Sequence, residues 1–156
     1  MKRFEPTPPW VTLEVIERDE NGDLVDEGNR PFSEALLAGG DQFTSAIGLM
    51  WTLQFHGWPK ARQVMKDGAG RARIVLAGEK NGVQIWMLKA KPSCWRLYFH
   101  VYENSTQFLF LHSYCKKKTD QDAGQEKKAR RILDRIGTRP SNFGAVRFEF
   151  PDPQSV

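Results

Sequence analysis

The sequence predicts an α+β fold, with a small antiparallel (mixed) sheet of about four to five strands. N-terminal helices should pack on one face of this sheet, and a C-terminal helix should follow it. Three observations support this class: apolar and polar residues alternate near the N-terminus, four segments in the middle are rich in β-branched and aromatic residues, and helical spacing returns near the C-terminus. The 156 residues suit one domain over 1–156, with an acidic insertion at about 18–40 and a short C-terminal tail at 138–156.

The N-terminal third predicts one strand followed by helices. Residues 10–17 alternate in polarity as a half-buried strand does, and Asn21-Gly22 is a tight-turn signal. A short helix is expected over 32–38, ended by the two glycines that follow it. A longer helix should run over 41–55, and Pro59 suits the first position of a helix that reaches Lys66.

Along the rest of the chain, the spacing of apolar residues changes twice, first to that of strands and then back to that of a helix. The four predicted strands are separated by turn signals and span 71–77, 83–89, 94–102 and 107–115. From Asp122 to Gly137 the apolar residues return to helical spacing. The alternation over 146–150 predicts a short edge strand.

The last two predicted strands should form a hairpin through a four-residue loop, which pairs Tyr102 with Gln107. At that register Arg96 faces Ser113. Two residues then lie on the opposite face as core residues, beside Trp95, Leu97 and Phe99: His112 and Tyr114. A single β-bulge would exchange the faces.

The charge is distributed unevenly. Residues 1–40 hold 4 basic and 9 acidic residues, whereas residues 41–156 hold 19 basic and 10 acidic residues. A basic body favours RNA, DNA or an acidic protein as partner, although solvated lysines produce the same balance. No apolar run is long enough for a membrane helix, and the first residues lack a signal-peptide core, so we expect a cytoplasmic protein.

The cysteine and histidine content argues against a metal site. Cys94 and Cys115 face each other in the predicted hairpin and could form a disulfide, but a cytosolic location favours two free thiols. The three histidines show no metal-ligand spacing. We therefore expect no metal and no other cofactor.

Three local features are candidates for chemistry. Lys116–Lys118 follow a strand and could hold phosphates, or could be a solvated surface run. Arg96 interrupts an apolar strand, so it must be paired with a carboxylate or have a function. His112 and Tyr114 could transfer protons, or could be satisfied core residues.

These features occur in a run of motifs. Ile85–Lys89 is followed by Trp95–Phe99, by Phe110–Thr119 and, in the last helix, by Glu126 and Ala129-Arg130. In order and spacing this run resembles the HigB-like (phage Gp49-like) branch of the RelE/ParE toxin superfamily, over about 55 residues. The chain departs from that family where Met87-Leu88-Lys89 replaces Glu-Leu-Arg, because lysine cannot reproduce the bidentate geometry of arginine.

The resemblance implies a RelE-like fold and the toxin of a type II toxin–antitoxin pair, usually a metal-independent mRNA endonuclease on the translating ribosome. Its partner would be a small antitoxin, often a helix-turn-helix protein. The alternatives are a ParE-like inhibitor of DNA gyrase, or a phage or mobile-element binding module without activity. The residues that would act in catalysis are Arg96, Lys116, Lys117, Tyr114 and His112. The residues that would contact RNA are Lys89, Lys91, Lys118, Arg130 and Arg131.

Overall fold

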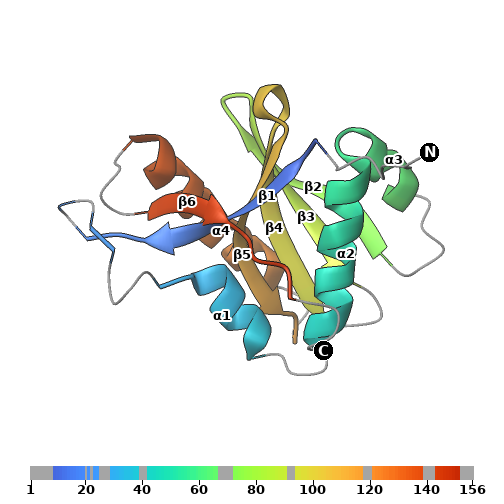
Figure 1. Ribbon diagram of the computed structural model, residues 1–156, viewed down its shortest axis with the longest axis horizontal. Coiled ribbons are helices and arrows are strands. Elements are labelled where there is room, and N and C mark those ends of the chain that lie inside the picture. The colour runs from blue at the N-terminus through green and yellow to red at the C-terminus, as the bar shows by residue number, and fades with distance from the viewer. Residues whose placement is uncertain are drawn as a thin grey trace, which may run out of the picture.

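The protein has an α+β fold in which a six-stranded mixed sheet is combined with four α-helices (Figure 1). This computed structural model describes residues 9–19, 21, 23–24, 29–38, 42–66, 72–90, 94–117, 121–138 and 143–151. No helix within these ranges is long and apolar enough to span a membrane.

The sheet has the strand order β2-β3-β4-β5-β1-β6. Its strands are β1 (Val11–Glu17), β2 (Ala72–Lys80), β3 (Val83–Ala90), β4 (Trp95–Tyr102), β5 (Gln107–Cys115) and β6 (Phe143–Arg147). β1 lies parallel to β5, and the other neighbours are antiparallel. The expected four to five strands are therefore too few, since the sheet continues past β1 to β6.

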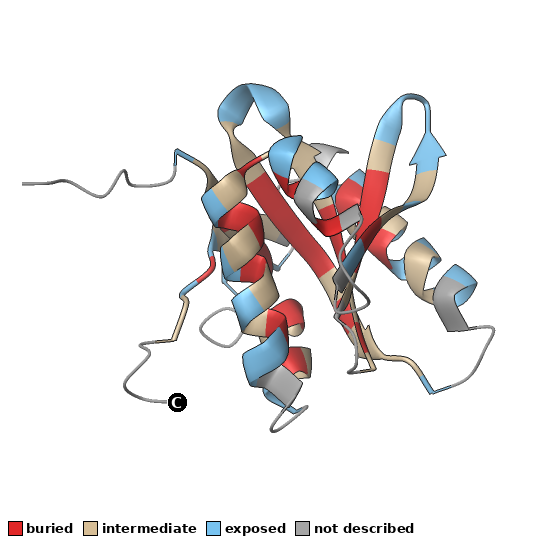
Figure 2. Ribbon diagram, turned by 90° about the vertical axis from the view of Figure 1, so that its right-hand side faces the viewer, coloured by how far each residue is buried: buried red, intermediate tan, exposed pale blue. Residues whose placement is uncertain are grey.

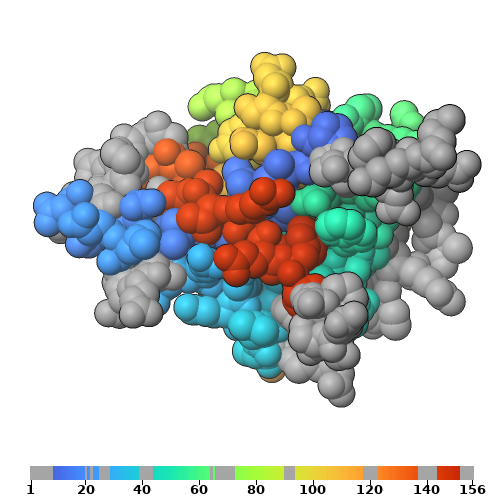
Figure 3. All heavy atoms as spheres, in the orientation of Figure 1, coloured from blue at the N-terminus to red at the C-terminus, as the bar shows by residue number. Residues whose placement is uncertain are grey.

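The C-terminal edge strand lies three residues earlier than the predicted 146–150. The two phenylalanines that follow the strand pack their side chains on the helices, although the N–H of Phe148 still donates to the carbonyl of Thr12 at 2.9 Å. Phe148 is buried against Phe32, with ring centroids 6.1 Å apart, and Phe150 contacts Trp51 at 5.3 Å. Figure 3 shows this red segment crossing the molecule beside the cyan α1 and the blue-green α2.

The N-terminal helices cover one face of the sheet, as predicted. They are α1 (Pro31–Leu37), α2 (Gln42–His56) and α3 (Lys60–Lys66), and each begins within one residue of its predicted start. Their apolar side chains pack on the sheet residues Trp86, Leu88, Trp95, Leu97, Phe99, Phe108 and Phe110. Figure 2 shows the buried residues concentrated in the sheet and on the helix sides that face it.

The opposite face of the sheet is covered by α4 (Gln121–Thr138), the predicted C-terminal helix. Ala129 and Leu133 of this helix pack on a second apolar cluster. The sheet residues of that cluster are Val15, Ile85, Met87, Tyr98, Leu109 and Leu111. Both faces of the sheet are covered by helices. On the α4 side, only side chains that α4 leaves uncovered are able to meet a ligand.

A β-bulge in β5 decides which side chains face α4. At the loop end Tyr102 pairs with Gln107, as predicted, but the register shifts between Tyr98 and Phe99. Beyond the shift Arg96 pairs with Tyr114. The predicted pairing of Arg96 with Ser113 is wrong, because the extra residue of a bulge exchanges the faces of the strand after it.

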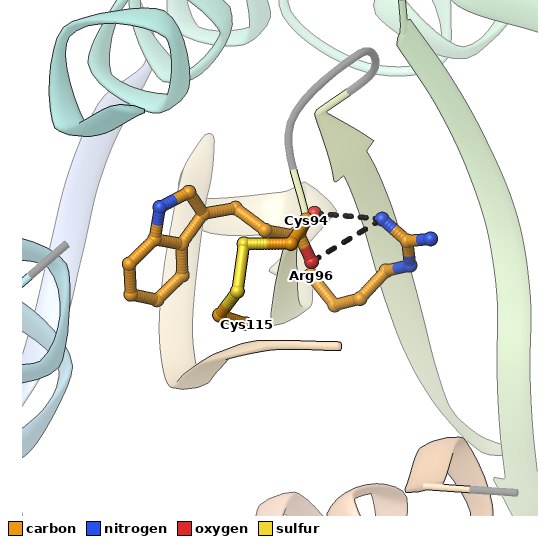
Figure 4. The surroundings of a disulfide bond; sticks show 4 residues. Cys94, Arg96 and Cys115 are labelled. Atoms are coloured by element: carbon orange, nitrogen blue, oxygen red, sulfur yellow. Dashed lines mark hydrogen bonds between the residues drawn. A yellow bond between two sulfur atoms is a disulfide. The ribbon is translucent and has the colours of Figure 1, made fainter. Parts of the chain in front are cut away.

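The two cysteines form a disulfide, with Cα atoms 4.8 Å apart, so the expectation of free thiols is wrong (Figure 4). The bulge places Cys115 opposite Trp95, next to Cys94. The bond joins the start of β4 to the end of β5. Disulfides are rare in cytosolic proteins, and cytoplasmic localisation stays a prediction.

A buried carboxylate holds the start of α1. Glu14 of β1 is 1% exposed and accepts hydrogen bonds from the hydroxyl and the backbone N–H of Ser33. The N-cap residue of α1, Arg30, forms no side-chain cap of its own. Glu14 therefore caps this helix from the neighbouring strand. Burial raises the pKa of Glu14, and the bonds from Ser33 only partly oppose this.

We expect Glu14→Gln to stabilise the protein relative to wild type more at about pH 7 than at about pH 4. The folded carboxyl has the higher pKa, so its contribution to stability is present below the unfolded value and is lost as the pH rises. Glu14→Ala should cost about 1–2 kcal/mol at about pH 4, because the cap is lost, and less at about pH 7, where the ionised carboxyl of the wild type stabilises the fold less. Urea unfolding measures each difference, with the exposed Glu34→Gln as control. A pH-independent effect of Glu14→Gln would contradict this assignment.

Candidate functional site

Four neighbouring strands place three cations and a tyrosine in one row across the sheet. Arg73 of β2 pairs with Lys89 of β3, Lys89 pairs with Arg96 of β4, and Arg96 pairs with Tyr114 of β5. Neighbouring strands are about 4.8 Å apart, so the backbone positions of the row span about 14 Å. We call these four residues the cation row.

The cation row lies on the side of the sheet that α4 covers. Two residues further along the strands, Val75, Met87 and Tyr98 pair in the same way and belong to the cluster under α4. Side chains two residues apart on a strand share a face. The row therefore forms one surface next to the start of α4.

Arg96 has the geometry expected of a binding residue. Its Nη1 donates to the backbone carbonyl of Trp95 at 3.1 Å and, at 3.5 Å, to that of Cys94 (Figure 4). Its Nε is buried without a hydrogen-bond partner. Within the described residues no carboxylate pairs with this guanidinium, so the salt bridge considered from the sequence is absent there. Among the described residues, the positive charge of Arg96 is therefore not neutralised by a carboxylate.

Two further aromatic rings, Tyr98 and His112, lie beside Tyr114 of the cation row. Tyr98, His112 and Tyr114 are nearly parallel, and each pair of ring centroids is 6.2 Å apart. His112 and Tyr114 were expected on the other face with Trp95, and the bulge makes that expectation wrong. Both residues are partly exposed, and His112 pairs with Tyr98.

His112 bonds through its ring to the start of α4. Its Nε2–H donates to Oε1 of Gln125, in the first turns of α4. Burial lowers the pKa of His112, the Gln125 bond partly raises it, and the positive charge of Lys128 lowers it further. The imidazole is therefore neutral near pH 7. In the tautomer that carries its hydrogen on Nε2, the lone pair is on Nδ1.

The lysines after β5 extend the site. Lys116 continues the ladder, because its N–H donates to the carbonyl of Cys94 at 2.8 Å. Lys117 follows it and is exposed. Two other residues predicted to contact RNA, Lys91 and Lys118, lie outside the described residues.

The structure separates the two arginines of α4 from the cation row. Arg130 donates from Nη1 to the carbonyl of Val83 at 3.0 Å, at the far end of β3 from Lys89. Arg131 lines the same region. The predicted RNA-contacting residues therefore form two groups rather than one.

Three residues near the site were not predicted: Arg73, Tyr98 and Gln125. The pairing of Arg73 with Lys89 depends on a bulge between Leu76 and Gly78, which no local pattern reveals. Tyr98 could have been found, because it lies two residues from Arg96 on the same strand. No pattern in the sequence could have identified Gln125, since its contact with His112 depends on where α4 crosses the sheet.

This arrangement suits a phosphate diester in chemical terms. Cations beside a transferring phosphoryl group stabilise its developing charge, and a neutral imidazole can accept a proton. In the part of the chain that is described, no three His, Cys, Asp or Glu residues gather where they could hold a metal ion.

Comparisons with known proteins assign no family. No protein-family model, no curated protein and no solved structure matches this chain. The functional argument therefore depends on the cation row and its neighbours.

Proposed function

We propose that this protein is the toxin of a type II toxin–antitoxin pair and acts as an endoribonuclease on mRNA. One observation carries the proposal: Arg96, Lys89 and Arg73 share a surface with a histidine and a tyrosine. The motif run that resembles the HigB-like branch contains four of these five residues. The sixth strand and the disulfide are features of this chain that the resemblance did not imply.

The reaction would use the ribose 2′-hydroxyl as nucleophile. A bond forms between O2′ and phosphorus while the bond from phosphorus to O5′ breaks. His112 would accept the 2′-hydroxyl proton at Nδ1, and Tyr114 or Lys116 would protonate the leaving O5′. Arg96, with Lys89 and Arg73, would offset the charge on the phosphorane-like transition state.

Arg73 would also replace the guanidinium that this chain lacks at the position of Lys89. The family has an arginine where this chain has Lys89, which loses the planar guanidinium. Arg73, which lies on β2 and is exposed, pairs directly with Lys89 of β3. In this proposal it supplies the second guanidinium from the neighbouring strand. The partner in the cell would be an antitoxin that covers this basic surface with acidic or apolar segments.

A purified translation reaction with a defined mRNA tests the proposal. We expect cuts, mapped by primer extension, that appear when ribosomes are present. Cuts without ribosomes would keep the nuclease and remove the ribosome requirement. If no cuts occur under either condition, the nuclease proposal is wrong, and inhibition of gyrase supercoiling with intact mRNA would then identify a ParE-like inhibitor. If neither mRNA cleavage nor gyrase inhibition is observed, the remaining interpretation is a phage or mobile-element binding module without activity.

A further inference from the structure

A second basic region lies away from the cation row, between α4 and the tip of the β2–β3 hairpin. It is a pocket of about 560 Å³. Its lining consists of Gly78, Glu79, Lys80, Glu126, Lys127, Arg130, Arg131 and Asp134. Four of these side chains are cations and three are carboxylates, so the pocket has a net positive charge.

Arg130 lies in this pocket with part of its guanidinium unsatisfied. Nη1 donates to the carbonyl of Val83, whereas Nη2 is buried and has no hydrogen-bond partner. A buried donor of a charged group is costly when nothing accepts from it. A rotation of the guanidinium toward the pocket would bring this donor to a ligand oxygen, which would then accept the hydrogen bond.

A glycine in β2 leaves room for the side chains of Glu126 and Arg130 at the surface of the sheet. Gly78 follows the bulge of β2, and a Cβ there would collide with the carboxylate of Glu126 and lie 3.7 Å from Nη2 of Arg130. Any other residue would therefore narrow the floor of the pocket. Glycine at this position lets the carboxylate and the guanidinium approach the strand.

One of the three carboxylates has a hydrogen-bond partner on the hairpin. Glu79 accepts a hydrogen bond from the amide of Gln84 at 2.9 Å, on the hairpin side of the pocket. Burial lowers the pKa of His100 most, and the positive charge of Arg130 lowers it further. Arg130 is therefore close enough to His100 of β4 to act on it electrostatically.

We propose that this pocket binds a phosphate group through Arg130, with Lys127 and Arg131 at its rim. Charge-assisted hydrogen bonds between arginine and phosphate suit an unsatisfied guanidinium nitrogen. The same chemistry occurs in a free nucleotide and in an RNA backbone. The proposal does not depend on the endoribonuclease activity, because the pocket shares no residue with the cation row.

Binding is measured with the full chain by following amide NMR signals of Gly78 and Glu79. The probes are inorganic phosphate, a nucleoside 5′-monophosphate and a short oligoribonucleotide. We expect saturable shifts in wild type and affinities at least about tenfold weaker in Arg130→Met, since a charge-assisted contact is lost. Arg135→Met is the matched control, because Arg135 is exposed on α4 outside the pocket lining, and it should bind as wild type does.

The outcomes separate the two sources of phosphate. Equal affinity for the monophosphate and the oligoribonucleotide identifies a small molecule, and about tenfold tighter oligoribonucleotide binding that still needs Arg130 identifies an RNA backbone. If Arg130→Met does not fold, Lys127→Met should still weaken binding, by about threefold. The proposal is overturned if no probe shifts Gly78, or if the pocket variants that fold bind as tightly as wild type. Cleavage is not part of this readout, so either proposal can fail alone.

Discussion

Replacing Arg96 with methionine is expected to lower RNA cleavage by about 10²–10³-fold, because one charged donor to the transition state is removed. Primer extension on a defined mRNA measures the loss, and growth arrest in cells should disappear with it. The methionine keeps most of the apolar stem of the arginine, so packing on β4 is preserved. This is the largest effect on activity that the site predicts.

The stability of the same variant separates function from folding. Nε of Arg96 is buried without a partner, so Arg96→Met should unfold at the same urea concentration as wild type or a higher one. Arg96→Lys keeps the charge without the planar guanidinium and should retain only part of the activity. Lys60→Met, at an exposed position of α3, is the control for loss of one positive charge. Full cleavage by Arg96→Met would show that the site is assigned wrongly.

Removal of the disulfide is expected to produce the largest loss of stability, about 3 kcal/mol for a loop of this length. The bond closes the chain between Cys94 and Cys115, which are 21 residues apart. A double substitution of both cysteines by serine, or addition of a dithiol reductant, should lower the unfolding midpoint. A reductant transfers two electrons and two protons to the bond and leaves two thiols.

The reduced protein should also lose order at the candidate site. The carbonyl of Cys94 accepts from the N–H of Lys116 and from Arg96, so both residues depend on this end of the hairpin. Hydrogen exchange at Lys116 should become faster when the bond is reduced. The double serine variant should show no further response to the reductant. An unchanged midpoint after confirmed reduction would contradict the predicted contribution.

Local patterns in the sequence were sufficient for the elements of the fold. The predicted strand 107–115 matches β5 at both ends, and the predicted helix from Asp122 to Gly137 lies within α4. These elements could be predicted because alternation, helical spacing and turn residues act over a few neighbouring positions. The number of strands was harder to predict, since β6 is short and the aromatic residues that follow it, Phe148 and Phe150, pack on the helices.

Only the tertiary structure decided which side chains meet. One bulge in β5 brings His112 and Tyr114 to the face of Arg96, and one in β2 brings Arg73 opposite Lys89. A bulge changes the pairing by one residue, and the side-chain period of a strand is two, so every later side chain changes face. The sequence by itself determined the strands, the helices and the candidate residues. Their assembly into one surface depended on long-range pairing, which no local pattern contains.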